Sequence, residues 1–322
     1  MSRVLVLGGT GWLGRELVSA ALALGADVTC VARGESGTAP EGAHFVAADR
    51  RRPDAYRELV GDWDEVIELS SEPDLVVPAV TGLGSRAAHW TLVSTVSVYA
   101  ADDEPGADES AALVEPVDLS QYADAKVAAE QVTAAALGDR LLIARPGLIV
   151  GPGDPSDRFG YWPARLDRGG PTIVPVMQNR FVQVIDVADL ASWLAAAGSA
   201  GLTGTINAVG RSLPMTDFFA AARAVTGFRG ELIEVTDAAL EAHGIQYWAG
   251  PRSLPLWLPS RATGFAQRDG SAYRRTDGTA RPLSDTLARV LQDERTRGLD
   301  RARRAGLTAD EERSLIRALA GR

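Results

Sequence analysis

The stretch VLVLGGTGWLGREL, residues 4–17, decides the fold of this chain. An apolar run that predicts a β-strand leads directly into glycines, and a helical pattern follows. Glycines at such a junction permit a tight turn and let the backbone approach a pyrophosphate, which then lies at the positive end of the helix. The alternative is a glycine-rich turn without a ligand. The context favours a dinucleotide-binding turn built from Gly8, Thr10, Gly11, Trp12, Leu13 and Gly14.

The first half of the chain alternates short β-rich runs with helical patterns, which is typical of a parallel sheet flanked by helices. The runs are continuously apolar, as expected for strands buried on both faces. We expect strands at residues 4–7, 28–31, 44–47, 65–69, 90–94 and 141–144. We expect helices at about residues 11–24, 53–60, 74–86 and 120–137. The predicted fold class is therefore α/β, a doubly wound parallel sheet with a smaller C-terminal lobe.

The sequence changes character after Arg145. GLIVGPGDPSDRFGYWPARL, residues 147–166, is rich in Gly, Pro and aromatics and is interpreted as loop and binding surface. FVQVIDVADLASWLAAA, residues 181–197, predicts a strand and then a helix that begins near Asp186. The C-terminal region predicts Arg/Glu-rich helices, and the charges of RTRGLDRARR, residues 295–304, are interpreted as a solvated helix face.

Composition narrows the classes of protein that the chain can belong to. Of its 322 residues, 46% are hydrophobic and 23% charged, and the net charge of −9 argues against a nucleic-acid or anionic-membrane surface. Cys30 is the single cysteine and only three histidines occur, so we expect neither an internal disulfide nor a metal site. The N-terminal sequence lacks the pattern of a signal peptide, and no apolar run has the length of a membrane span. A cytoplasmic protein without membrane or nucleic-acid partners is the expectation.

The end of the second predicted strand bears on the choice of dinucleotide. VTCVARG, residues 28–34, carries Arg33 where an NAD site places a carboxylate on the ribose hydroxyls. A guanidinium can bind the 2′-phosphate of NADP in a bidentate manner, so we favour NADP, with NAD as the alternative. An exposed loop arginine without a ligand is also consistent with Arg33. Asp49 follows the third strand, where its carboxylate accepts from the adenine amino group or caps the next helix.

Lys126 is the only lysine in a chain with 33 basic residues, and it follows Tyr122 by four positions. On a helix this spacing places both side chains on one face. A free phenol titrates near pH 10 and needs a fixed positive neighbour to act as a general acid or base near neutrality. The ammonium has three donors, so it can hold a nicotinamide ribose while lowering the pKa of the phenol. The pair therefore predicts a catalytic acid/base site.

A cluster of hydroxyls, Ser94, Thr95 and Ser97, ends the predicted strand in TLVSTVSVYA, residues 91–100. A hydroxyl at the carboxyl end of a parallel strand can hydrogen-bond a substrate carbonyl. The alternative is that these hydroxyls only occupy the end of the strand and bind no substrate.

Together, GGTGWLG, Asp49, STVSVY, YADAK and ARPGLIVGPGD resemble, in order and spacing, the extended short-chain dehydrogenase/reductase superfamily. More narrowly, the chain resembles the NAD(P)-dependent epimerase/dehydratase branch, over about residues 3–210. The resemblance implies Tyr122 as acid/base, Lys126 as its partner and Thr95 as the carbonyl-polarising hydroxyl. It also implies a Rossmann-like core, a C-terminal substrate lobe and a homodimer.

From these features we place an NAD(P)-binding domain at residues 1–152 plus about 181–212, and a substrate lobe at about 153–180 and 213–322. The cofactor site is also expected to include Arg50, Ser70 and Pro146. The resemblance implies that the turn of Arg145, Pro146 and Gly147 lies near the nicotinamide.

The chain departs from the sugar-nucleotide epimerases of that branch in QNRFVQVID, residues 178–186. Where those enzymes tend to carry an Arg and a His, this chain has Asn179 and Gln183. Its aromatic residues suit an apolar or ring-containing substrate better than a diphosphate, although core packing is an equal alternative for them. The expected substrate contacts are Ser97, Arg158, Tyr161, Trp162, Gln183 and Trp248.

The leading functional hypothesis is an NADP-dependent oxidoreductase that transfers a hydride between nicotinamide and a small carbonyl or alcohol substrate. The alternative keeps the same residues in a redox-neutral epimerase or dehydratase acting on a sugar-like or nucleotide-linked substrate. A dehydratase needs a further acid/base pair, for which Asp102, Asp103 and Glu104 are nearby but better explained as a solvated loop. A catalytically silent dinucleotide sensor or RNA-binding relative is disfavoured by the Tyr–Lys pair and the acidic charge.

Overall fold

The computed structural model describes residues 1–52, 54–70 and 72–320, which form two compact units. Unit 1 comprises Met1–Ile149, Val184–Arg211 and Arg268–Ala280. Unit 2 comprises Val150–Gln183, Ser212–Gln267 and Arg281–Arg322.

The segment Arg268–Ala280, which the sequence analysis placed in the C-terminal lobe, belongs to unit 1. It contains α8 (Ser271–Arg275), whose Tyr273 is buried and packs edge-to-face on Trp193 at 5.0 Å between ring centroids. The indole nitrogen of Trp193 donates to the Thr276 carbonyl at 3.0 Å. The Asp269 amide also donates to the Ala107 carbonyl at 3.0 Å, so several contacts hold this segment in the first unit.

A parallel sheet, seven-stranded in the described part of the chain, organises unit 1. The strand order is β10-β6-β5-β4-β1-β2-β3, so the order reverses between β1 and β4. In sheets of this kind ligands bind beyond the carboxyl ends of the strands at such a reversal. The strands are β1 (Arg3–Leu7), β2 (Asp27–Ala32), β3 (His44–Ala47), β4 (Trp63–Glu68), β5 (Ala87–Val93), β6 (Leu141–Ala144) and β10 (Gly204–Ile206).

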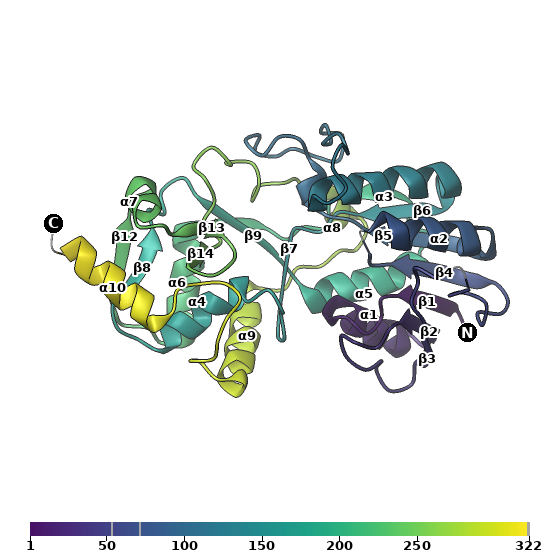
Figure 1. Cartoon of the computed structure of the whole chain (residues 1–322), viewed down its shortest axis with the longest axis horizontal. Coiled ribbons are helices and arrows are strands. Elements are labelled where there is room, and N and C mark those ends of the chain that lie inside the picture. The colour runs from purple at the N-terminus through teal and green to yellow at the C-terminus, as the bar shows by residue number, and fades with distance from the viewer. Residues whose placement is uncertain (53, 71, 321–322) are drawn as a thin grey trace. The chain divides into compact units, whose positions relative to one another are not determined.

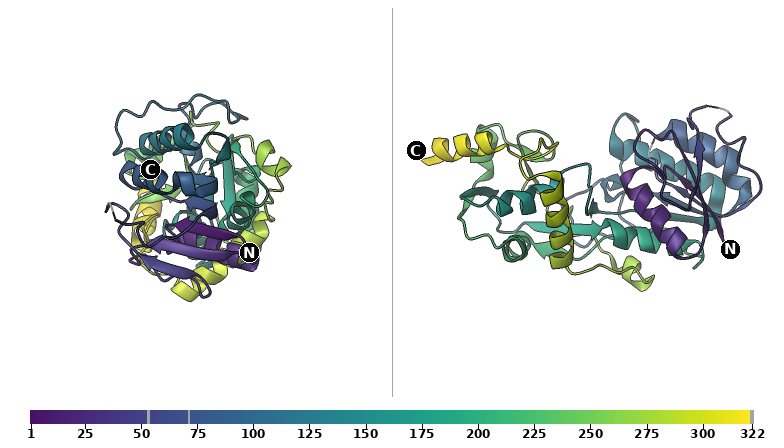
Figure 2. Two further views of the ribbon diagram at one scale, coloured as in Figure 1. Left: turned by 90° about the vertical axis from the view of Figure 1, so that its right-hand side faces the viewer. Right: turned by 90° about the horizontal axis from the view of Figure 1, so that it is seen from below.

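Helices cover both faces of this sheet (Figure 1). Alternate residues of β1 point to opposite faces. Val4 and Val6 join one apolar cluster, which takes in α1 (Trp12–Ala23) and α5 (Val187–Ala197). Leu5 and Leu7 join the other, which takes in α2 (Pro73–Leu83) and α3 (Tyr122–Leu137). In the view from below in Figure 2, α1 lies in purple along the strands of unit 1. Single-turn helices η1 (Gly84–Arg86), η2 (Val96–Val98) and η3 (Gly138–Arg140) complete the layers.

The predicted α/β fold is confirmed, with two local differences in unit 1. The helix expected over residues 53–60 does not form: Pro53 lies outside the described residues, and 54–58 form turns. The edge strand β3 is largely exposed rather than buried on both faces.

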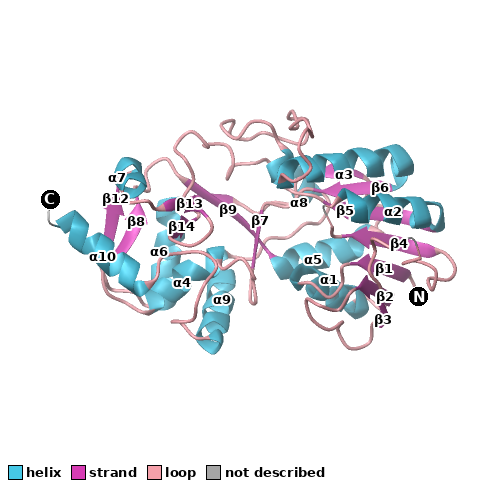
Figure 3. Ribbon diagram, in the orientation of Figure 1, coloured by secondary structure: helices cyan, strands magenta, loops and turns pink. Residues whose placement is uncertain are grey.

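Unit 2 combines short strands and helices joined by loops (Figure 3). Its elements, some of which continue into unit 1, are β7 (Leu148–Val150), α4 (Arg158–Asp167), β8 (Thr172–Pro175), β9 (Phe181–Asp186), β11 (Ser212–Pro214), α6 (Met215–Thr226), β12 (Leu232–Val235), α7 (Asp237–Ala242), β13 (Gln246–Trp248), β14 (Ser253–Pro255), α9 (Leu283–Arg297) and α10 (Ala309–Ala320). Residues 147–166 are thus not all loop, because α4 forms within them and buries its aromatic side chains.

The charged stretch 295–304 also differs from the expected solvated helix face. Helix α9 ends at Arg297, and beyond it Arg301 and Arg303 turn inward. Both bind the buried carboxylate of Glu294, Arg303 at 2.8 Å, and Arg301 also binds the buried Asp157. These guanidiniums compensate two carboxylates that would otherwise be costly to bury.

Candidate active site

The glycine-rich turn joins β1 to α1 by a close approach of backbone to backbone. Gly8 has a φ of +100°, which favours glycine, and a Cβ on Gly14 would lie 2.3 Å from the Gly8 carbonyl oxygen. Helix α1 begins at Trp12, and its N-cap residue, Gly11, has no side chain with which to cap the helix. The amides at a helix start attract an anion. The turn therefore fits a pyrophosphate, and any side chain at Gly14 would collide with the backbone of the turn itself.

A cavity of about 240 Å³ opens beside this turn, beyond the carboxyl ends of the strands around the β1/β4 reversal. It brings together seven residues predicted for the cofactor: Gly8, Thr10, Gly11, Arg33, Asp49, Arg50 and Ser70. Trp12, Leu13 and Gly14 lie in the first turn of α1 and do not line it. Pro146 lies just after β6, where its carbonyl accepts from the Val96 amide at 3.0 Å.

Arg33 lies on the wall of this cavity, about half exposed. Its guanidinium is 3.1 Å from the carboxylate of Glu35, a partner that the sequence analysis overlooked although it lies two residues away. Arg15 supports the same loop by donating to the carbonyls of Ser36 at 3.3 Å and Thr10 at 2.9 Å. An exposed ion pair is weak, so a phosphate can displace Glu35 from Arg33.

The segment after β3 is held by its own charges. The Asp49 carboxylate accepts a hydrogen bond from the Arg51 amide at 3.1 Å. It therefore stabilises a turn, and does not cap a helix, which was the alternative role expected for it. Arg50 is buried and donates to Glu68 at 2.6 Å and to the Ser70 hydroxyl. Burial works against the charge of Arg50, but Glu68 outweighs it and the pKa of the guanidinium is raised. Arg50 therefore lines the cavity in a fixed position and links the segment after β3 to the end of β4.

Lys126 is buried on α3, one turn after Tyr122, the first residue of that helix. Its Nζ donates to the Val93 carbonyl at 2.6 Å and to the Ser70 carbonyl at 3.2 Å. Val93 is the last residue of β5 and Ser70 lies two residues beyond the end of β4, so the ammonium is held at the carboxyl edge of the sheet. Burial lowers the pKa of Lys126 to about 8, against the opposing charges of Glu68 and Glu130. Tyr122 is 56% exposed.

The hydroxyl cluster follows β5 directly. Thr95 is 8% exposed and begins η2, where its Oγ1 accepts from the Ser97 amide at 3.2 Å and lies 3.3 Å from the Ser97 hydroxyl. Ser94 is buried, and its hydroxyl makes no hydrogen bond to any described residue. Thr95 and Ser97 therefore lie together at the strand end, as predicted.

Glu130 of α3 belongs to a buried polar network that the sequence analysis did not predict. Arg145 donates to both oxygens of Glu130, at 3.0 and 2.7 Å, and to the Tyr99 hydroxyl at 3.1 Å. Tyr99 in turn donates to the Asn207 side chain at 2.6 Å. The guanidinium of Arg268 lies over the Tyr99 ring, 4.6 Å from its centroid. The available signal was Glu130, an acidic residue four positions after Lys126 on the same helical face.

Three of the six predicted substrate contacts, Tyr161, Trp162 and Gln183, are packed into the protein. Tyr161 and Trp162 are each 1% exposed, and the Trp162 indole donates to the Pro255 carbonyl at 2.7 Å. They are core residues, which was the alternative interpretation, and they are not available to a substrate. Gln183 is also buried. Arg158 and Trp248 do come together, with the guanidinium 5.1 Å from the ring centroid.

The described residues contain no group of three or more His, Cys, Asp or Glu side chains placed to hold a metal ion. Among them, no helix is both long enough and apolar enough to cross a membrane.

The parallel sheet, the glycine turn at its reversal point and the neighbouring cavity define a dinucleotide-binding fold of the Rossmann type. The model of the NAD dependent epimerase/dehydratase family matches residues 4–80 and 74–210. The chain belongs to this family.

Curated relatives include reductases from two streptomycetes. The 2′-dehydrokanamycin reductase of Streptomyces kanamyceticus is 34% identical over 182 residues, which is 53% of this chain and 51% of that protein. The dTDP-4-dehydrorhamnose reductase of Streptomyces griseus is 32% identical over 209 residues, 63% of this chain and 67% of that protein. The chain thus matches about half the length of the first relative and two thirds of the second.

Solved structures share the fold over nearly the whole chain. A putative epimerase from Burkholderia cenocepacia has a TM-score of 0.69 at 21% identity, covering 92% of this chain and 98% of its own. The Bordetella bronchiseptica enzyme WbmH, solved with NAD+, has a TM-score of 0.65 at 17% identity, covering 92% and 99%.

Proposed function

We propose that this chain is an NADP-dependent reductase of a small, ring-containing carbonyl compound, with Tyr122, Lys126 and Thr95 as its catalytic residues. The observation that carries the proposal is the placement of Lys126. A chain that otherwise uses arginine buries one ammonium at the carboxyl edge of the sheet, held by the carbonyls of Val93 and Ser70. Burying an ammonium is unfavourable, so such a position favours a functional role.

The chain's residues divide the work as follows. The glycine turn and the start of α1 bind the pyrophosphate, and Arg33 exchanges Glu35 for the 2′-phosphate of NADP. When bound, the nicotinamide supplies the hydride. Thr95 donates a hydrogen bond to the substrate carbonyl oxygen and polarises it. Tyr122 gives its phenolic proton to that oxygen as charge develops there, and the ammonium of Lys126 stabilises the resulting phenolate. A small-molecule substrate and a homodimeric assembly belong to the same proposal.

Two reductase-named relatives at more than 30% identity support net reduction. Their printed names point to keto-sugar substrates, one in an aminoglycoside and one in a nucleotide-linked deoxysugar. Family membership equally supports the second candidate function, a redox-neutral epimerase or dehydratase that keeps its cofactor bound.

Purification followed by turnover separates the two candidates. A reductase binds added NADPH reversibly and oxidises it in stoichiometric amount when a panel of keto-sugars is supplied. An epimerase copurifies with tightly bound dinucleotide and isomerises a sugar without consuming added NADPH, and that result would replace the reductase proposal.

A further inference from the structure

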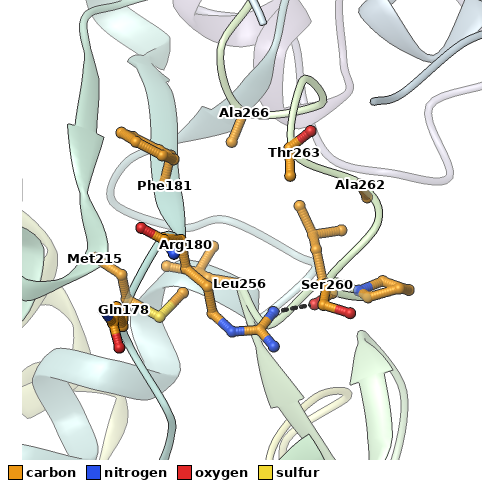
Figure 4. A pocket seen from close by; sticks show the side chains of 12 residues that line it. Gln178, Arg180, Phe181, Met215, Leu256, Ser260, Ala262, Thr263 and Ala266 are labelled. Atoms are coloured by element: carbon orange, nitrogen blue, oxygen red, sulfur yellow. Dashed lines mark hydrogen bonds between the residues drawn. The ribbon is translucent and has the colours of Figure 1, made fainter. Parts of the chain in front are cut away.

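Unit 2 has a cavity of its own, of about 330 Å³, and none of the predicted substrate residues lines it. It is formed by the turn before β9, the first residue of α6 and the loop after β14. Figure 4 shows Phe181 and Met215 on one side and Ser260, Ala262 and Thr263 on the other, with the guanidinium of Arg180 reaching between them. The volume is within the range of small-molecule pockets.

Arg180 is the one charged side chain among the described residues that line this cavity, and its charge is already paired. Its Nη2 donates to Asp237 at 2.6 Å, its Nε to the Val176 carbonyl at 2.8 Å, and its Nη1 to the Leu258 carbonyl. Asp237 is fixed in turn, because the Trp257 indole donates to it at 3.0 Å. Arg180 thus fastens the loop after β14 to the turn before β9.

A pocket with this charge arrangement does not suit a nucleoside diphosphate. The phosphate oxygens would lose water without gaining an uncommitted cation, so their desolvation would be unfavourable. Detaching Arg180 to bind them would leave the carboxylate of Asp237 without its partner. The net charge of −9 adds a general repulsion of anions.

The remaining polar groups of the cavity are neutral. Within the described part of the chain, the side chains of Gln178, Asn179 and Ser260 make no hydrogen bond, so their donors and acceptors are open to a ligand. Amides and hydroxyls both donate and accept, which matches a set of ligand hydroxyls. The partly exposed ring of Phe181 offers a flat apolar surface beside them.

We propose that this cavity binds a neutral, hydroxyl-bearing ring of the glycoside class and discriminates against nucleoside diphosphates. The inference rests on the proposed function in that the ring belongs to the same chemical class as the proposed substrates of the reductase.

The test uses the full-length protein, with phenyl β-D-glucopyranoside and UDP as probes in saturation-transfer NMR and calorimetry. The glucoside should bind, and Phe181→Ala should weaken it at least tenfold, with Phe181→Leu intermediate. UDP should show no binding that responds to Phe181→Ala. Glucoside binding that is absent, or that Phe181→Ala leaves unchanged, contradicts the proposal, as does UDP binding that is lost in Phe181→Ala.

Gln178→Arg gives an independent test, because Gln178 is exposed and its replacement does not disturb the core. The added guanidinium has no carboxylate partner in the wall and should raise the affinity of the cavity for UDP at least tenfold, in a manner reversed by Phe181→Ala. No gain in UDP affinity contradicts the charge argument. NADPH binding measured on the same samples distinguishes failure of the reductase proposal from failure of the cavity proposal. If the protein does not bind NADPH, the reductase proposal is wrong. If it binds NADPH but not the glucoside, only the proposal for this cavity is wrong.

Discussion

Two hydrogen bonds, of 3.0 and 2.7 Å, join the guanidinium of Arg145 to the carboxylate of Glu130. Both side chains are about 95% buried, and Glu130 lies one helical turn after Lys126 on α3. The ion pair therefore fixes the helix that carries the proposed catalytic residues, about two turns beyond the solvent-exposed Tyr122.

Replacing Arg145 with Met should destabilise the protein strongly, because it leaves the carboxylate of Glu130 buried without a partner. We expect a loss of about 3–5 kcal/mol in the free energy of unfolding, measured by urea denaturation. The double variant Arg145→Met/Glu130→Met should recover most of that loss, since no buried charge remains. A double variant no more stable than Arg145→Met would show that the two residues act separately.

Lys126→Met should abolish activity and yet stabilise the fold at neutral pH. The folded pKa of Lys126, about 8, is below the ordinary 10.5, so the folded state binds this proton more weakly than the unfolded state. Wild-type stability therefore rises with pH between about 8 and 10.5, relative to Lys126→Met, and the cost of burying the charge is fully present below 8. Urea melts of both proteins from pH 7 to about pH 11 measure the difference. A variant less stable at pH 7 would contradict the burial argument.

The Arg33–Glu35 pair makes a prediction about cofactor choice. Arg33→Ala should weaken NADPH binding by about 10- to 100-fold, the usual worth of hydrogen bonds to a charged group, and leave NADH binding unchanged. Glu35→Gln should tighten NADPH binding about two- to fivefold, because an exposed ion pair no longer competes with the phosphate. Glu41→Gln, an exposed residue that does not line the cavity, is the charge-matched control. Tighter binding of NADH than NADPH by the wild type would overturn the NADP assignment.

His89 should make the free energy of unfolding of unit 1 depend on pH. The imidazole is buried on β5, with Nε2 2.6 Å from the Leu202 carbonyl and Nδ1 3.4 Å from Glu65. Burial alone would lower the pKa of His89, but the Glu65 carboxylate and the Leu202 carbonyl raise it. Because the folded pKa is above the unfolded value of about 6.5, the contribution is complete below that pH and is lost as pH rises through the folded pKa. The stability advantage of wild type over His89→Gln should shrink accordingly, and a pH-independent difference would contradict it.

Much of unit 1 could be predicted because its signals are local. The glycines of residues 8–14 specify a turn, and continuous apolar runs specify strands buried on both faces. Lys126 could be selected from composition alone, because it is the one lysine. The helix expected at 53–60 does not form. Just before it, Arg50 and Arg51 bind carboxylates on β4 and around the start of α2, and residues 54–58 form turns.

What the sequence could not predict depends on contacts between distant residues. Glu130 and Arg145 are fifteen positions apart, and Tyr99 meets Asn207 across 108. The aromatic residues of α4 illustrate the same limit. As residue types, Tyr161 and Trp162 suit a wall that binds a ring, but in the structure both are buried in the core. Arg180 is similar: only the structure shows that Asp237 has already neutralised it.

The most direct test of the central claim is the rate of NADPH oxidation with a keto-sugar panel, compared between wild type and Tyr122→Phe. We expect the wild type to reduce at least one keto-sugar. We expect Tyr122→Phe to lose about 10²–10⁴-fold in kcat, as for positioned proton transfer, with NADPH affinity unchanged. A Tyr122→Phe enzyme within a few-fold of the wild-type rate, or a wild type that oxidises no NADPH with any member of the panel, would contradict it.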